Sequence, residues 1–142
     1  MMKANMLLAD DDTEVLAALR AAFASEDYDV VIAKNGREAI ERMRERRFDI
    51  ALLDLHMPVK GGWEAFDRLT SINPLLQVIV ITAQMDQYPR AAVAGVAALM
   101  EKPLDLPRLL RTIDILLCEP VEHRLSRLAG KHPITRYLRA DM

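Results

Sequence analysis

Residues 48–58 read FDIALLDLHMP, and this stretch decides the fold. Ile50 to Leu53 form an unbroken apolar run, without the alternation of apolar and polar residues that marks a strand with one wet face. An unbroken run is typical of a strand that is covered on both faces in a parallel sheet. The run ends at Asp54, and Pro58 closes the segment. We therefore expect a parallel sheet that carries a carboxylate at the end of this buried strand.

Four similar runs set the fold class: Met6–Ala9, Val30–Ala33, Val78–Ile81 and Ala97–Met100. Each of the five runs is followed by a segment that we expect to be helical, from its apolar spacing or from the residues at its ends. These segments are residues 15–23, 38–47, 63–69, 89–94 and 106–117. Asp105 is the expected N-cap of the last helix, and Pro107 lies in its first turn. This alternation predicts an α/β fold of (βα)5 type, a doubly wound five-stranded parallel sheet in the order 2-1-3-4-5.

Length and composition limit the class of protein. A chain of 142 residues suits one main domain with a single core, and a net charge of −2 gives no overall attraction to nucleic acid or membrane. Its single cysteine, Cys118, cannot form an internal disulfide, which fits a reducing compartment. No stretch approaches the ~20 apolar residues of a membrane span, and MMKANMLLAD is too short for a signal-peptide core. We expect a cytoplasmic protein with no membrane contact.

The character of the sequence changes after Cys118. Residues 119–142 contain the breakers Gly130 and Pro133, and we expect a C-terminal extension or linker outside the domain at residues 3–118. Residues 121–128 have the spacing of one short amphipathic helix, and a frayed linker is the alternative. The basic residues of the tail are most simply solvated, so we expect no direct binding of nucleic acid by Arg124, Arg127, Lys131, Arg136 and Arg139.

Polar residues follow four of the five predicted strands. Asp10 and Asp11 follow the first, Asp54 the third, Thr82 the fourth and Lys102 the fifth. The first and third strands are neighbours in this sheet order, about 4.8 Å apart, so the three aspartates should share one pocket. Two carboxylates 4 Å apart repel by roughly 4 kcal/mol at an effective dielectric constant of 20. A hard cation such as Mg²⁺, which prefers oxygen ligands, would relieve this repulsion.

The remaining groups indicate phosphoryl transfer. Lys102 supplies a fixed positive charge, Thr82 a hydroxyl group, and Asp54 a carboxylate that can act as a nucleophile. Phosphoryl transfer depends mainly on positioning and on neutralising the charge of three equatorial oxygens. A metal ion, an ammonium group and a hydroxyl group together meet that requirement.

The motifs LLADDD, IALLDLHMP, VIVITA and EKP occur in this order at the predicted strand ends. In this respect residues 3–118 resemble the receiver domain of bacterial two-component response regulators, which is CheY-like and has a flavodoxin-like fold. The resemblance implies a phosphoacceptor, not a conventional enzyme. It implies that Asp54 accepts a phosphoryl group, in a Mg²⁺-dependent reaction, from the phosphohistidine of a sensor histidine kinase or phosphotransfer protein.

The resemblance also implies roles for the neighbouring residues. Asp10, Asp11, Asp54 and the backbone carbonyl of His56 would hold Mg²⁺, while Thr82 and Lys102 would contact the phosphoryl oxygens. The side chains of His56 and Gln84 would tune the access of water, and so the lifetime of the acyl phosphate.

Phosphorylation in this family changes the surface that corresponds here to residues 89–94, 97–100 and 106–117, which would regulate an output partner or form a homodimer. Leu99 departs from the family pattern, which usually has Tyr or Phe at this position. The segment from Thr82 to Lys102 is also shorter than the common pattern by about two residues, roughly half a helical turn. Pro89 falls where the helix at 89–94 should begin.

Three other interpretations stay open. Asp10, Asp11 and Asp12 could form only an acidic helix start, with Asp12 as the N-cap. The chain could also be a pseudo-receiver, a protein interaction module that has the receiver fold but works without phosphorylation. A phosphatase of the haloacid dehalogenase type also uses an aspartyl nucleophile and Mg²⁺, but His56 stands where its second aspartate would be.

Overall fold

The computed structural model describes residues 4–57, 61–83, 90–91, 94–120, 122, 125 and 136–139. The chain divides into two compact units, Met1–Leu76 and Gln77–Met142. Within the described part of the chain, no helix is long and apolar enough to cross a membrane.

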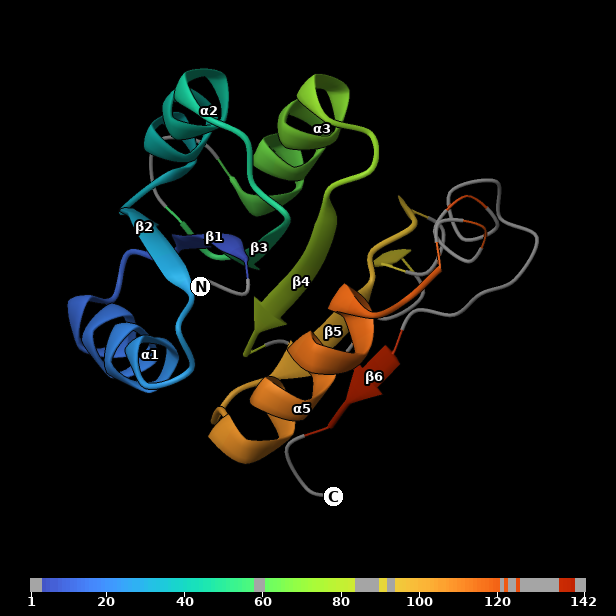
Figure 1. Ribbon diagram of the computed structural model, residues 1–142. Coiled ribbons are helices and arrows are strands. Elements are labelled where there is room, and N and C mark those ends of the chain that lie inside the picture. Colours follow the sequence, from blue (N-terminus) through green and yellow to red (C-terminus); the bar gives the residue numbers. More distant parts are fainter. Residues whose placement is uncertain are drawn as a thin grey trace. The chain divides into compact units, whose positions relative to one another are not determined.

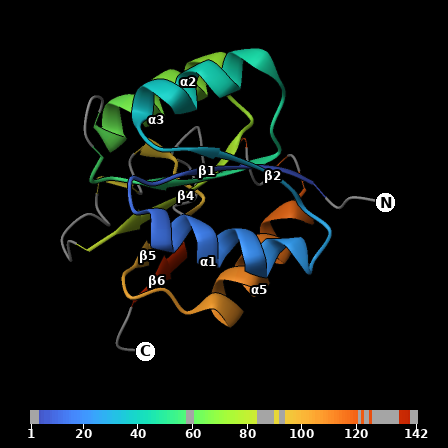
Figure 2. The ribbon, with the colours of Figure 1, turned by 90° about the vertical axis from the view of Figure 1, so that its left-hand side faces the viewer.

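The first unit is a three-stranded parallel sheet with helices on both faces. Its elements, in chain order, are β1 (Asn5–Ala9), α1 (Thr13–Ala24), β2 (Asp29–Ala33), α2 (Gly36–Glu45), β3 (Ile50–Asp54) and α3 (Gly62–Ile72). The strands are parallel, with β1 paired between β2 and β3. Figures 1 and 2 show α1 on one face of these strands and α2 and α3 together on the other. The predicted strands and helices of this unit are confirmed, with ends that differ by up to three residues.

Local sequence explains where these helices begin and which face they bury. Asp12 is the N-cap of α1, since its side chain accepts hydrogen bonds from the amides of Glu14 at 2.9 Å and Val15 at 3.3 Å. This confirms the predicted cap. Leu16, Leu19 and Phe23 recur at helical spacing on the buried face of α1. In α2 the cap is Asn35, whose side chain accepts from the amide of Glu38 at 2.9 Å.

Burial differs among the three strands of this unit. All five residues of β3 are buried, as the unbroken apolar run predicted, and so are Met6 to Ala9 of β1. In β2 only Ala33 is buried, and the other four residues are half-exposed. The prediction of full coverage was therefore wrong for this strand. The reason is its position, because β2 pairs on one side with β1 and forms the border of this group of strands.

The second unit contains β4 (Gln77–Thr82), β5 (Ala98–Glu101), α5 (Leu106–Leu117) and β6 (Arg136–Leu138). Asp105 caps α5 by accepting a hydrogen bond from the amide of Arg108 at 3.1 Å, as predicted. The buried side chain of Gln77 donates to the carbonyl of Leu116 at 2.8 Å and so ties the start of β4 to the end of α5. Of the predicted helix at 89–94, Arg90, Ala91 and Ala94 are helical, and the other three residues lie outside the described residues.

The third strand of this unit, β6, was not predicted. It pairs with β5 in parallel, and Leu99 lies opposite Tyr137 in the register. The amide of Arg136 donates to the carbonyl of Ala97 at 3.1 Å. The prediction of five strands was therefore one strand short, because a three-residue segment is too short to show a periodic pattern. In the remaining tail, Glu122 and Leu125 are helical, while Val121 and Leu128 of the predicted short helix lie outside the described residues.

Candidate functional site

The first unit brings three carboxylates together at the carboxyl ends of β1 and β3. Ala9 and Leu53 are register partners on these neighbouring strands, so the next residues, Asp10 and Asp54, leave the sheet side by side. One carboxylate oxygen from each of Asp10, Asp11 and Asp54 lies within 4.8 Å of the others. Asp10 and Asp54 are each 2% exposed, whereas Asp11 is exposed. This group, called the acid cluster below, has the composition that the sequence predicted.

Backbone amides orient the two buried members of the acid cluster. Oδ1 of Asp10 accepts a hydrogen bond from the amide of Asp12 at 2.9 Å. Oδ1 of Asp54 accepts from the amide of His56 at 3.0 Å, across the turn that leaves β3. The side chain of His56 itself is exposed. Main-chain amides therefore hold one oxygen of each carboxylate, and the path of the backbone contributes to their orientation.

The chemistry of the acid cluster suits a hard divalent cation. Three carboxylates within a few ångströms repel one another, and the repulsion is strongest where burial lowers the local dielectric constant. All three ligands offer oxygen only, which is the preference of Mg²⁺, and no thiol or imidazole belongs to the group as a zinc site would require. The partly exposed position of Asp11 leaves room for the water ligands that Mg²⁺ retains.

The second unit holds the other two predicted residues together. Thr82 ends β4 and is 2% exposed, while Lys102 directly follows β5 and is half-exposed. The amide of Lys102 donates to the carbonyl of Thr82 at 2.8 Å. The acid cluster thus belongs to the first unit, and the pair of Thr82 and Lys102 belongs to the second. Gln84, the remaining predicted residue, lies outside the described residues.

Sequence reasoning missed two polar residues beside this pair. Glu101 is the last residue of β5, is 6% exposed, and lies opposite Thr82 in the register. The hydroxyl group of Tyr137, on β6, donates a hydrogen bond to Oε2 of Glu101. A signal for Glu101 was present, since ALMEKP places an acid at the end of an apolar run just as IALLD does. Tyr137 had no such signal, because its strand could not be predicted.

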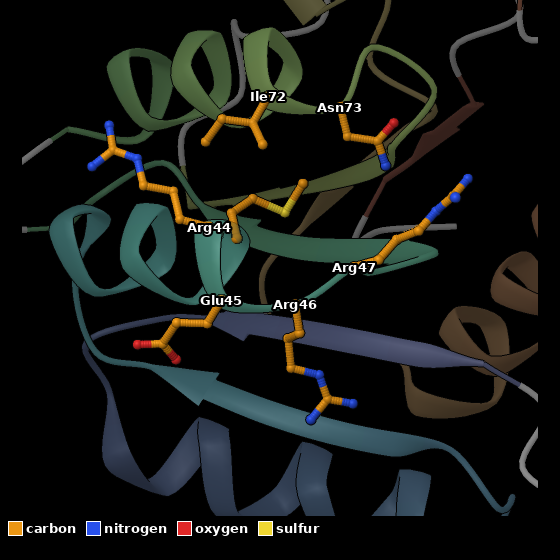
Figure 3. Close-up of a pocket in the computed structure, with 7 residues that line it drawn as sticks. Arg44, Glu45, Arg46, Arg47, Ile72 and Asn73 are labelled. Atoms are coloured by element: carbon orange, nitrogen blue, oxygen red, sulfur yellow. The ribbon is translucent and has the colours of Figure 1, made fainter.

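A surface hollow of about 510 Å³ lies at the carboxyl ends of α2 and α3. None of the predicted site residues lines it. Arg44, Arg46 and Arg47 contribute to its lining, and Figure 3 shows their side chains pointing in three different directions. Arg46 donates to Asp29 at 2.6 Å, so this cation already has an anionic partner. The hollow therefore presents no convergent set of donors for an anion, unlike a phosphate site.

Comparison with known proteins identifies the family of this chain. A family model for the response regulator receiver domain matches residues 6–114. The chain belongs to this family. Receiver domains of two-component systems are phosphoacceptors and bind Mg²⁺ at an acidic pocket, and both are general properties of the family.

Curated relatives support the assignment. The transcriptional regulatory protein ZraR of Klebsiella oxytoca is 33% identical over 125 residues, which cover 86% of this chain and 27% of the relative. A response regulator receiver protein of Anaeromyxobacter sp. is 36% identical over 106 residues, 73% of this chain and 44% of that protein. The chain thus spans about a quarter to under a half of the length of these relatives.

Solved structures show the same fold. A CheY-like receiver domain protein from Methanospirillum hungatei has a TM-score of 0.76 and 25% identity, covering 86% of this chain and 96% of that chain. CheY in a CheX–CheY–BeF3–Mg complex from Borrelia burgdorferi also has a TM-score of 0.76 at 25% identity, with 81% and 90% covered. The receiver family therefore keeps its CheY-like, flavodoxin-like parallel α/β fold in this chain.

Proposed function

We propose that this chain is a phosphorylation-dependent switch of a two-component or phosphorelay system, with Asp54 as the phosphoacceptor. The donor would be the phosphohistidine of a sensor histidine kinase or phosphotransfer protein. The observation that supports this proposal is the position of Asp54, a buried carboxylate at the end of β3, inside a cluster of three acids in a member of the receiver family. The family match favours this role over that of a phosphatase.

The proposed chemistry is a single displacement at phosphorus. A carboxylate oxygen of Asp54 attacks the phosphorus atom, the phosphorus–nitrogen bond of phosphohistidine breaks, and its electron pair leaves with the imidazole. The product is an acyl phosphate on Asp54. The amide of His56, 3.0 Å from Oδ1 of Asp54, orients the carboxylate for this attack. Asp10, Asp11, Asp54 and the carbonyl of His56 would hold Mg²⁺, which supplies positive charge to offset the carboxylates and the phosphoryl oxygens.

In this proposal Thr82 and Lys102 contact the oxygens of the phosphoryl group once it is on Asp54. Phosphorylation adds about two negative charges, and a conformer that brings the hydroxyl and ammonium groups to those charges is favoured by its tighter interaction with them. The resulting change would alter the surface around β5 and α5, which would bind an output partner or a second copy of the chain.

The test is phosphorylation of the purified chain by acetyl phosphate, measured by intact-mass spectrometry. We expect the wild type to gain one phosphoryl group with Mg²⁺ and none with EDTA. The Asp54→Asn variant should gain none. The control is Asp67→Asn, which makes the same chemical change at an exposed position of α3.

Phosphorylation of Asp54→Asn at the rate of the wild type would contradict the assignment of the acceptor. A wild-type chain that folds, binds Mg²⁺ and takes up no phosphoryl group would instead support the pseudo-receiver, an interaction module that works without phosphorylation.

A further inference from the structure

A second surface hollow, of about 410 Å³, lies between α5 and β6 in the second unit. The strand β6 forms one wall, and its pairing with Ala98–Met100 of β5 holds it in place. The other wall is α5, where the side chain of Arg108 donates a hydrogen bond to the carbonyl of Arg139, the residue after β6, at 2.9 Å. Figure 1 shows β6 beside β5 and α5. This α5–β6 hollow is therefore formed by two segments that hydrogen bonds link.

The part of α5 that lines the α5–β6 hollow is one stripe of the helix. Its residues stand at positions i, i+3, i+4 and i+7, and they are Arg108, Arg111, Thr112 and Ile115. Thr112 is buried, and its hydroxyl group donates to the carbonyl of Arg108 at 2.8 Å. Arg111 and Ile115 are exposed. The stripe thus presents two cations beside one exposed apolar side chain.

Three arginines and no acidic residue line the α5–β6 hollow. The third arginine is Arg136, which is exposed on β6. Within the described part of the chain, the guanidinium groups of Arg111 and Arg136 form no ion pair, and that of Arg108 donates to a neutral carbonyl. Because the whole chain has a net charge of −2, this positive charge is a local feature. Such a surface favours an anionic partner.

Apolar side chains lie next to these cations. Ile115 is 47% exposed, and Leu138 on β6 is half-exposed. Both line the α5–β6 hollow, and covering them would contribute about 25 cal/mol for each Å² of apolar surface removed from water. Arginine is also the charged residue that is enriched at protein interfaces. The phosphate backbone of a nucleic acid would engage the cations alone, so the combination favours a protein partner.

We propose that the α5–β6 hollow binds an acidic segment of a partner protein, with carboxylates on its three arginines and an apolar side chain against Ile115 and Leu138. Guanidinium groups suit this role because their planar fork can donate two hydrogen bonds to one carboxylate. The inference gives the chemistry of an output partner, and in that respect it rests on the function proposed above. Binding at the hollow requires no phosphoryl group, so it can be tested apart from Asp54.

The first test measures the binding of fluorescein-labelled peptides to the full chain by fluorescence anisotropy. The probe is a peptide in which glutamate and leucine alternate. One comparison peptide has glutamine in place of every glutamate, and another has glycine in place of every leucine. We expect the glutamate–leucine peptide to bind most tightly, and added salt to weaken its binding, because part of the attraction is electrostatic.

Arg111→Gln tests the charge of the hollow in the same assay. The variant loses a charged hydrogen-bond donor, so the glutamate–leucine peptide should bind about tenfold more weakly. Arg44→Gln is the matched control, because Arg44 is an exposed arginine that lines the hollow at the ends of α2 and α3. The control should bind the peptide like the wild type. Equal affinities of the wild type and both variants would overturn the inference.

Ile115→Ala separates the binding of a peptide from the capture of any anion. The variant keeps all three arginines and shortens one exposed apolar side chain. It should weaken binding of the glutamate–leucine peptide by about threefold and leave that of the glutamate–glycine peptide unchanged. Equal effects on the two peptides would show that no leucine packs against Ile115, contrary to the proposal.

The position of the bound peptide is read from the amide NMR signals of the full chain. We expect the largest shifts at Arg111–Ile115 of α5 and in β6. Shifts centred elsewhere, equally tight binding of the glutamine peptide, or no binding at millimolar peptide would refute the site. A DNA oligonucleotide that displaces the peptide at lower concentration than the unlabelled peptide does would contradict the class of partner. A wild-type chain that binds the peptide but takes up no phosphoryl group on Asp54 would instead refute only the proposed function.

Discussion

The backbone amide of Lys102 donates a hydrogen bond of 2.8 Å to the carbonyl oxygen of Thr82. This bond continues the pairing of β4 with β5 by one residue beyond Glu101. The main chain therefore sets the separation of the two residues. Because of this, a substitution that removes only the functional group of either side chain should test its chemical role without unfolding the unit.

Replacing Lys102 by glutamine tests the proposed contact with the phosphoryl group. The variant keeps the first half of the aliphatic stem and the backbone hydrogen bond but loses the charge, so phosphorylation by acetyl phosphate should slow by about 100-fold. The free energy of unfolding should change by less than about 0.5 kcal/mol, since the side chain is half-exposed. Lys34→Gln, at an exposed lysine after β2, is the matched control. Equal rates for all three chains would remove Lys102 from the mechanism.

Replacing Asp11 by asparagine tests the electrostatics of the acid cluster. Without a divalent cation the three carboxylates repel, so the variant should be more stable than the wild type in EDTA, by about 1 kcal/mol. Mg²⁺ should raise the melting temperature of the wild type by mass action, and should raise that of the variant much less. Thermal denaturation with EDTA and with Mg²⁺ measures both effects. Glu14→Gln serves as the control, and a variant that Mg²⁺ stabilises as much as it does the wild type would exclude Asp11 as a ligand.

Replacing Gly62 by alanine tests the turn that follows Asp54. The amide of Gly62 donates to the carbonyl of Leu55 at 3.1 Å, and a Cβ at Gly62 would lie only 2.8 Å from that carbonyl carbon and oxygen. Backbone atoms cannot yield as a flexible side chain can, so the turn between Asp54 and His56 must shift. We expect a loss of 1–3 kcal/mol of stability and slower phosphorylation.

Its control is the neighbouring glycine. A Cβ at Gly61 would meet nothing within 4 Å, so Gly61→Ala should match the wild type in denaturant unfolding and in labelling. Two glycine variants with the same stability would show that the turn after β3 tolerates displacement, contrary to this expectation.

The elements that were predicted well are those whose local sequence pattern matches their burial and hydrogen bonding in the structure. The unbroken run from Ile50 to Leu53 became a fully buried strand, and Asp12 and Asp105 cap the helices that follow them. The acid cluster was predictable because sheet order alone makes β1 and β3 neighbours, whatever their side chains. These inferences needed only local pattern and topology.

What escaped prediction depends on contacts distant in sequence. The segment Arg136–Leu138 becomes a strand because β5 offers it hydrogen-bonding groups, and no pattern in three residues reports this. The partnership of Tyr137 with Glu101 joins residues 36 positions apart, so neither residue reveals the other. In β2, the partial exposure of Val30 to Ile32 follows from the strand's place in the sheet, which its apolar composition does not reveal.

The strand β6 also bears on how this protein should be handled in the laboratory. The receiver match stops at residue 114, and truncation after Cys118 would suggest itself as a tidy boundary. Such a shortened chain would lose β6, the strand that pairs with Ala98 to Met100 of β5. The backbone amides and carbonyls of β5 would then be exposed and could pair with extended peptides from solution. Dimers or aggregates of that fragment would then be products of the truncation and would say nothing about how the intact protein associates.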